Sequence, residues 1–283
     1  MKVILSRKGF DSAAGGFPSP ILPDGRLVSL PIPDVDSKTS YDDLCFEPGT
    51  SYYDLMVSLT PVYRAEGVVR SLQRSTKCHL DPDLLSSVRE RRDGFRGAFG
   101  QIGTAQRHLE NQNVEPGDLF LFFGWFRGTS RLGFQYSYLG EDRHEIYGYL
   151  QIGEVLAVDL HTSIPAWLEG HPHLTEHRRR DRTNRIYVAR DHLSWDRACA
   201  GYGVFRSHPS LILTKEGHAR SRWHLPGFFQ EVRISYHNIK SFRGGHFQSA
   251  TRGQEFVIQG SEEVIKWAKG LIEKNNTENG VRE

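Results

Sequence analysis

A cation, a carboxylate and two hydroxyls gather in one short segment near the start of the chain. These residues are Lys8, Asp11, Ser12 and Ser19. They follow the apolar run 3–5, so the pattern predicts a buried strand that delivers polar side chains to a site. Gly15 and Gly16 allow the backbone to approach a ligand that a Cβ atom would exclude. The segment predicts a ligand-binding loop, and the alternative is a strand followed by an ordinary proline-fixed surface loop.

A second segment whose residues could catalyse a reaction or bind a metal is His79-x-Asp81-x-Asp83. In an extended chain these alternate residues share one face, which places an imidazole beside two carboxylates. Such a set suits a metal that prefers mixed nitrogen and oxygen donors, or acid–base catalysis. The alternative is structural: Asp81 or Asp83 caps a helix that begins near Leu84, with Pro82 in its first turn.

Three histidines, His171, His173 and His177, also have a spacing typical of metal ligands. The segment 174–185 that contains or follows them is strongly polar, which favours a mobile surface loop. We therefore leave these histidines outside the predicted site.

The chain carries two clusters of basic residues and one basic-aromatic segment. Arginines gather at 89–96 and at 177–185. These clusters could neutralise phosphates, and the alternative is that they form solvent-exposed faces paired with nearby acidic residues. The segment 220–226 contains Arg222 and Trp223, and a guanidinium beside an indole ring suits a nucleotide. The alternative is that Trp223 packs at a domain edge.

Composition excludes several classes of protein. With 283 residues, of which 38% are hydrophobic, the chain can bury a substantial core. No apolar run is long enough to span a membrane, and charge follows residues 1–5 too soon for a signal peptide, so we expect a cytoplasmic protein. Three widely spaced cysteines indicate neither a disulfide framework nor a zinc ribbon. The glycine spacing matches neither a P-loop nor a dinucleotide-binding fingerprint.

The pattern predicts an α+β, strand-rich single fold with a barrel-like centre and a C-terminal helix. A turn at 22–26 and a strand at 27–32 make the first 33 residues a hairpin-like unit, and 34–51 is a loop. We predict further strands at 119–126, 131–138, 146–158, 186–189, 211–215 and 255–257, and helices at 53–59 and 264–274.

The domain organisation follows from the absence of repeats and low-complexity linkers. We expect one domain over 1–283, with a subdivision into an N-terminal part at 1–112, a barrel-like part at 113–275 and a disordered tail at 276–283.

Two family resemblances follow from these motifs. The segments 117–123 and 147–155 resemble the PUA-like barrels, a group that includes readers of modified bases. Over nearly the whole chain, the sequence resembles the nucleotide modification associated domain 3 family, on the segments 6–12, 15–16, 18–21, 23–25, 30–33, 79–83 and 117–124. That resemblance implies a role beside bacterial and phage systems that modify DNA bases.

We hypothesise an enzyme that acts on a nucleotide or on DNA. Asp11, His79 and Asp81 would perform acid–base or metal-assisted work, and the sequence assigns no cofactor. The predicted nucleotide-binding residues are Lys8, Ser12, Gly15, Gly16, Ser19, Trp125, Arg222 and Trp223. The alternative is a non-catalytic reader of modified bases with an aromatic cleft. An enzyme requires the three catalytic residues to converge on one pocket, whereas a reader does not.

Overall fold

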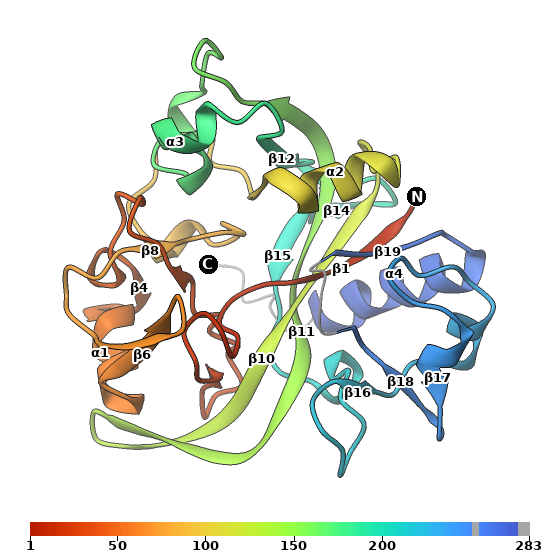
Figure 1. The fold of residues 1–283 in the computed structure, drawn as a ribbon, viewed down its shortest axis with the longest axis horizontal. Helices are drawn as coiled ribbons and strands as arrows, with labels where there is room; N and C mark the ends of the chain where they lie inside the picture. The colour runs from red at the N-terminus through yellow and green to blue at the C-terminus, as the bar shows by residue number, and fades with distance from the viewer. Residues whose placement is uncertain (251–254, 277–283) are drawn as a thin grey trace.

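The computed structural model describes residues 1–250 and 255–276, and a large mixed sheet lies at its centre (Figure 1). Six strands follow the order β19-β1-β10-β11-β12-β9, while β15 pairs with β11 and β2 with β10. The strands are β1 (Val3–Arg7), β2 (Ser19–Ile21), β9 (Ala98–Gln101), β10 (Leu119–Leu132), β11 (Gln135–Ala157), β12 (Arg185–Ala189), β15 (Tyr202–Val204) and β19 (Glu255–Ile258).

Strand β1 lies inside the sheet, parallel to β10 and antiparallel to β19. Its side chains alternate between two hydrophobic clusters, with Val3 and Leu5 on one face and Ile4 on the other. This explains why the opening apolar run forms a strand, since every residue of 3–5 is buried. The predicted buried strand is confirmed, and its C-terminal end leads into the polar loop.

The antiparallel pair β10 and β11 is the longest hairpin of the sheet. Register shifts at Phe122/Phe123 and at Phe126/Gly128 interrupt the ladder, and such irregularities bend strands. The prediction of one strand at 131–138 is wrong, because the chain reverses at Gly133 and Phe134 between the two strands. Gly133 has a φ of 61°, a conformation that glycine adopts at little cost.

The sheet curls until side chains of its two edge strands meet. Gln101 on β9 donates a hydrogen bond from Nε2 to Oε1 of Glu255 on β19, at 2.7 Å. Helix α2 (Gly103–Asn111) follows β9 and also packs against β19. No backbone ladder joins β9 to β19 within residues 1–250 and 255–276, so the centre is a curled open sheet. The α+β class with a barrel-like centre is confirmed, and the likeness to PUA-like barrels is not.

Helix α4 (Glu262–Asn276) covers one face of the sheet through Val264, Ala268 and Ile272. The Ser261 Oγ atom accepts a hydrogen bond from the backbone N–H of Val264, at 3.3 Å, and so caps the start of the helix. Helix α4 extends one residue into the tail predicted at 276–283. Asn275 is buried and Asn276 donates to the Tyr149 hydroxyl at 2.7 Å. The remainder of the predicted tail, 277–283, lies outside the described residues.

Small elements of the N-terminal part pack around a third hydrophobic cluster on one side of the β10–β11 hairpin (Figure 1). The region 34–51, predicted as a plain loop, contains two short strands and a 3₁₀ turn. The turn predicted at 22–26 is present, because the Leu22 N–H donates to the Arg26 carbonyl at 2.9 Å and Ile21 bridges Leu27. The strand predicted at 27–32 is wrong, since Leu27 forms only that isolated bridge and Ile32 belongs to the separate strand β3 (Ile32–Pro33). The elements are β3 (Ile32–Pro33), β4 (Cys45–Glu47), β5 (Thr50–Ser51), α1 (Tyr52–Leu59), β6 (Val62–Ala65), β7 (Val68–Ser71) and β8 (Cys78–His79), with 3₁₀ turns η1 (Tyr41–Asp43) and η2 (Ser86–Val88).

The remaining elements follow β11. The strand predicted at 211–215 is absent, because Leu211 ends a 3₁₀ turn and the next residues form only isolated bridges. These elements are η3 (Ala166–Leu168), η4 (Pro172–Leu174), α3 (Glu176–Arg179), β13 (His192–Leu193), β14 (Asp196–Ala200), η5 (Pro209–Leu211), β16 (Arg222–Trp223), η6 (Gly227–Gln230), η7 (Ile239–Ser241), β17 (Phe242–Arg243) and β18 (His246–Gln248).

Strands from both sides of the predicted subdivision near 112 share the central sheet, and the single domain stays a prediction. Among the described helices, none has the length and apolar composition needed to cross a membrane. The cytoplasmic location likewise stays a prediction.

Candidate functional site

A cavity of about 300 Å³ lies where β1 ends and its polar loop begins. Strands β8 and β9 and the segment around η4 complete its walls. Its polar and charged lining consists of Arg7, Lys8, Asp11, Asp34, His79, Asp81, Gln101, His173 and Arg178. The three predicted catalytic residues, Asp11, His79 and Asp81, therefore line one cavity. Their catalytic role stays a prediction.

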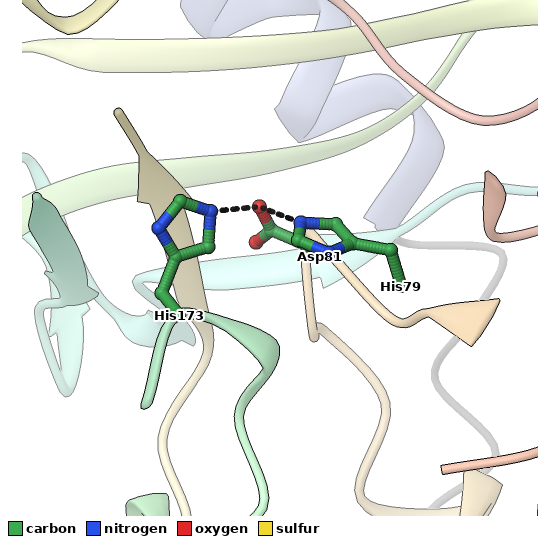
Figure 2. A group of neighbouring side chains, drawn as sticks. All are labelled: His79, Asp81 and His173. Carbon is green, nitrogen blue, oxygen red and sulfur yellow. Dashed lines mark ion pairs between the residues drawn. The ribbon is translucent and has the colours of Figure 1, made fainter. Parts of the chain in front are cut away.

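The floor of the cavity holds a carboxylate surrounded by imidazoles. Figure 2 shows Asp81 between the rings of His79 and His173. Asp81 Oδ2 lies 3.5 Å from His79 Nε2 and 3.6 Å from His173 Nε2. Asp81 Oδ1 lies 3.5 Å from His171 Nε2 and accepts a hydrogen bond from the Gly100 backbone N–H at 2.9 Å. One buried carboxylate thus organises three histidines, and we call these four residues the Asp81 cluster.

Each imidazole that faces Asp81 Oδ2 is held from behind by an acceptor. Asp34 Oδ2 lies 2.8 Å from His79 Nδ1 and also receives Arg178 Nη2 at 2.9 Å. Asn184 Oδ1 lies 2.7 Å from His173 Nδ1. Such partners fix the tautomer and orientation of a functional histidine.

Three residues of the Asp81 cluster have pKa values that are shifted in different directions. Burial would raise the pKa of Asp81, but the imidazoles of His171 and His79 outweigh it and hold that pKa well below its usual range. Burial lowers the pKa of His173 to about 3, so this ring is neutral at pH 7. Burial opposes the charged form of His79 as well, yet Asp34 and Asp81 raise its pKa. Groups pushed apart in this way are typical of functional sites.

The surface loop predicted around His171 and His173 is wrong. Both residues are buried, with exposed fractions of 2% and 3%. Asn184 Nδ2 donates to the His173 carbonyl at 2.9 Å, and Gly100 leaves space for the ring, since a Cβ there would lie 2.2 Å from His173 Cδ2. His177 is exposed and lines neither this cavity nor its neighbour. The spacing His-x-His was the sequence signal that could have placed these two histidines in the site, but the polarity of 174–185 favoured a surface loop instead.

Asp83 belongs to a different structure from His79 and Asp81. It accepts hydrogen bonds from Arg91 Nη1 at 2.7 Å and from Arg89 Nη2 at 3.1 Å. The chain forms no α-helix at Leu84, only the 3₁₀ turn η2 two residues later, so the capping interpretation is wrong. The face shared by all three residues is wrong as well, because Asp83 forms an isolated bridge with Ala98 and turns its side chain to the arginines.

Most arginines of the two clusters form ion pairs with acidic side chains, and some of these pairs are solvent-exposed. Arg92 pairs with Glu169 and Arg180 with Glu176, both in exposed positions. Arg89 and Arg91 instead pair with the buried Asp83, and the ion pair of Arg178 with Asp34 lies at the cavity wall.

The loop after β1 contains both cavity residues and residues that only shape it. Lys8 Nζ forms an ion pair with Glu255 at 2.9 Å and lies 4.4 Å from the centre of the Phe99 ring. Asp11 Oδ1 accepts the backbone N–H groups of residues 13 and 14, both at 2.7 Å, which fixes the turn. Both side chains line the cavity.

Three predicted nucleotide-binding residues, Ser19, Gly15 and Gly16, line neither this cavity nor the second cavity described below. Ser19 is buried and its Oγ accepts the Leu30 backbone N–H at 3.0 Å. A Cβ on Gly15 would lie 2.0 Å from the Phe10 ring, and one on Gly16 would lie 3.0 Å from Arg64 Cβ. These three residues determine the shape of the loop and do not line either cavity.

A second cavity of about 340 Å³ adjoins the first and shares Arg7 and Asp11 with it. Ser12 lies in its lining with Trp125 and Arg220. The Arg220 guanidinium stacks 3.8 Å from the centre of the Trp125 ring and donates a hydrogen bond to Ser12 Oγ. The predicted Trp125 therefore faces a cavity, and Arg220 is a residue that the sequence analysis missed.

Arg222 and Trp223 do not lie at either cavity. Trp223 is fully buried and donates from Nε1 to His144 Nδ1 at 3.1 Å, so its ring has no free face for a base. Arg222 is exposed on β16. Successive side chains of a strand point to opposite faces, so Arg222 points to solvent because Trp223 points into the core.

Comparisons with curated proteins and with solved structures found no match. The family model described as nucleotide modification associated domain 3 matches residues 2–259, which include both cavities and the whole Asp81 cluster. The chain therefore belongs to the nucleotide modification associated domain 3 family.

Proposed function

We propose that this chain is an enzyme that modifies the base of a nucleotide, either free or within DNA. Its family supports a nucleotide-modification-associated role. The observation that carries the enzymatic assignment is the Asp81 cluster at the floor of a cavity that Asp11 also lines. A protein that only holds a base has no need of a buried carboxylate among three imidazoles.

The proposed division of labour follows from burial and charge. His79, His173 and Asp81 act on the reacting group, because they lie together at the cavity floor with shifted pKa values. Asp11 lines both cavities, so it lies beside a ligand that occupies either. It hydrogen-bonds the polar edge of the substrate.

The second cavity supplies the substrate anchor. Arg7 and Arg220 both line it, and two guanidinium groups provide the charge-assisted hydrogen bonds that a phosphate accepts. Ser12 adds a hydroxyl, and Trp125 backs the Arg220 guanidinium. A phosphate in this cavity places the rest of the nucleotide toward the Asp81 cluster through the shared residues Arg7 and Asp11.

Arg220→Gln is expected to weaken binding of nucleoside 5′-monophosphates by roughly tenfold to a hundredfold, because one charge-assisted hydrogen bond contributes about 1.5–3 kcal/mol. Binding of the corresponding nucleosides, which lack the phosphate, is expected to stay unchanged. Calorimetric titration with the four ribonucleotides and four deoxyribonucleotides measures both.

The matched control is Arg92→Gln, which removes a guanidinium from the exposed pair with Glu169. This control is expected to bind nucleotides like the wild type. Equal weakening in both variants, or loss of nucleoside binding in Arg220→Gln, would refute the phosphate anchor.

A further inference from the structure

We propose that the Asp81 cluster binds one divalent transition-metal ion through His79 Nε2, His173 Nε2 and Asp81 Oδ2, and that His171 positions Asp81 without binding the metal. This inference deepens the proposed function by adding a metal to its catalytic cluster. It rests on the geometry of the cluster, and its test uses metal ions alone.

The donor atoms have the separation that one ion requires. All three lie within 4.8 Å of one another, and the two oxygen-to-nitrogen distances are 3.5 and 3.6 Å. Ligands about 2.1 Å from a metal, at tetrahedral or octahedral angles, lie about 3.0–3.4 Å apart. Each of these two oxygen-to-nitrogen separations therefore needs to contract by only a few tenths of an ångström to hold an ion.

Hydrogen bonds set the tautomers of the two metal-binding rings. A carboxylate accepts but does not donate, so the Asp34 contact requires the proton of neutral His79 on Nδ1. Asn184 Nδ2 donates to the carbonyls of Val158 and His173, at 3.3 and 2.9 Å, which identifies its Oδ1 as the acceptor. His173 therefore also carries its proton on Nδ1. In the neutral form of the two rings, each Nε2 atom presents a lone pair toward Asp81.

Those lone pairs face an oxygen that also carries lone pairs. With both rings neutral, the three acceptors repel one another at this distance, and a positive centre between them removes that repulsion. A metal ion satisfies all three at once, and a single proton satisfies only one pair.

His171 has the opposite tautomer. Its Nδ1 accepts the backbone N–H of His173 at 3.2 Å, so the proton of the neutral ring lies on Nε2. That Nε2 is buried, has no hydrogen-bond partner among the described residues and lies 3.5 Å from Asp81 Oδ1. The Gly100 N–H donates to the same oxygen. The Gly100 N–H and the His171 Nε2–H therefore both face Oδ1, and Oδ2 remains for the metal.

The donor set indicates the class of metal. Two imidazoles and one carboxylate suit Zn²⁺, Fe²⁺ or Mn²⁺, whereas Ca²⁺ and Mg²⁺ prefer sites built from oxygen. Three protein ligands leave coordination positions open toward the cavity, which suits a catalytic ion better than a structural one.

Titration of the chelator-treated full chain with Zn²⁺, and with Co²⁺ as an absorbing probe, tests this assignment. We expect one ion per chain, and at least hundredfold weaker binding in His79→Ala and His173→Ala. His171→Gln is expected to keep the one-to-one stoichiometry and the Co²⁺ spectrum, with affinity reduced by about 10- to 100-fold, as for other outer partners of a metal site. His177→Gln, an exposed neighbour, is the matched control and should bind like the wild type.

A thermal melt of wild type and Asp81→Asn with and without Zn²⁺ covers the case in which an alanine variant fails to fold. Zn²⁺ is expected to raise the melting temperature of the wild type only. Absence of stoichiometric binding, or loss of the ion from His171→Gln as complete as from His79→Ala, would overturn the assignment. Metal binding without nucleotide binding would refute only the proposed function, and nucleotide binding without metal only the metal centre.

Discussion

Asp81→Asn is expected to lower turnover of the nucleotide substrate by roughly 10²- to 10⁴-fold, the range that a positioned catalytic group contributes. The substitution removes the charge of a side chain that is 4% exposed and that faces three imidazoles. It preserves volume, and the asparagine Oδ1 still accepts the Gly100 N–H, so the fold should persist. Steady-state kinetics and a thermal melt on the same preparation separate loss of chemistry from loss of structure.

The control for this variant is Asp93→Asn, the same change at an exposed position. It should leave turnover and melting temperature unaltered. An Asp81→Asn protein that keeps more than half of the wild-type activity would exclude Asp81 from catalysis.

Asp83→Asn is expected to cost about 3–5 kcal/mol of unfolding free energy, because it breaks a buried ion pair by removing one partner. The exposed fractions of the side chains of Asp83, Arg89 and Arg91 are 3%, 17% and 10%, so both guanidinium groups would stay largely buried without a carboxylate. Urea denaturation measures this loss. Metal and nucleotide binding by the folded protein should be unchanged, since Asp83 lies outside the Asp81 cluster.

Asp191→Asn provides the comparison, because Asp191 forms an exposed pair with Arg96 at 3.4 Å. Its loss is expected to cost less than about 1 kcal/mol. If the two asparagine variants prove equally stable, the buried pair has no special role in stability.

The sequence predicted those parts of the fold that local pattern determines. The run 3–5, helix α4 and the apolar stretches of β10 and β11 each carry their own periodicity or burial signal. Short strands such as β3 and β8 have no such signal, because two residues do not define a period. Their pairing depends on the third hydrophobic cluster that surrounds them.

The candidate site was predictable where its residues are neighbours in the chain. His79 and Asp81 are two residues apart on an extended segment, so their common face follows from strand geometry. His173 and Arg220 reach the cavities from distant segments, and only tertiary packing brings them there. Asp83 lies two residues further along the same segment, yet its carboxylate pairs with Arg89 and Arg91 and not with the cluster.

The central claim is that the chain chemically modifies a nucleotide through the Asp81 cluster. The most direct measurement is mass spectrometry of nucleosides from the DNA, RNA and free nucleotide pool of cells that produce either the wild type or Asp81→Asn at equal levels. We predict a nucleoside of changed mass with the wild type and its absence with the variant. Identical nucleoside compositions in all three fractions of the two cultures would contradict the account.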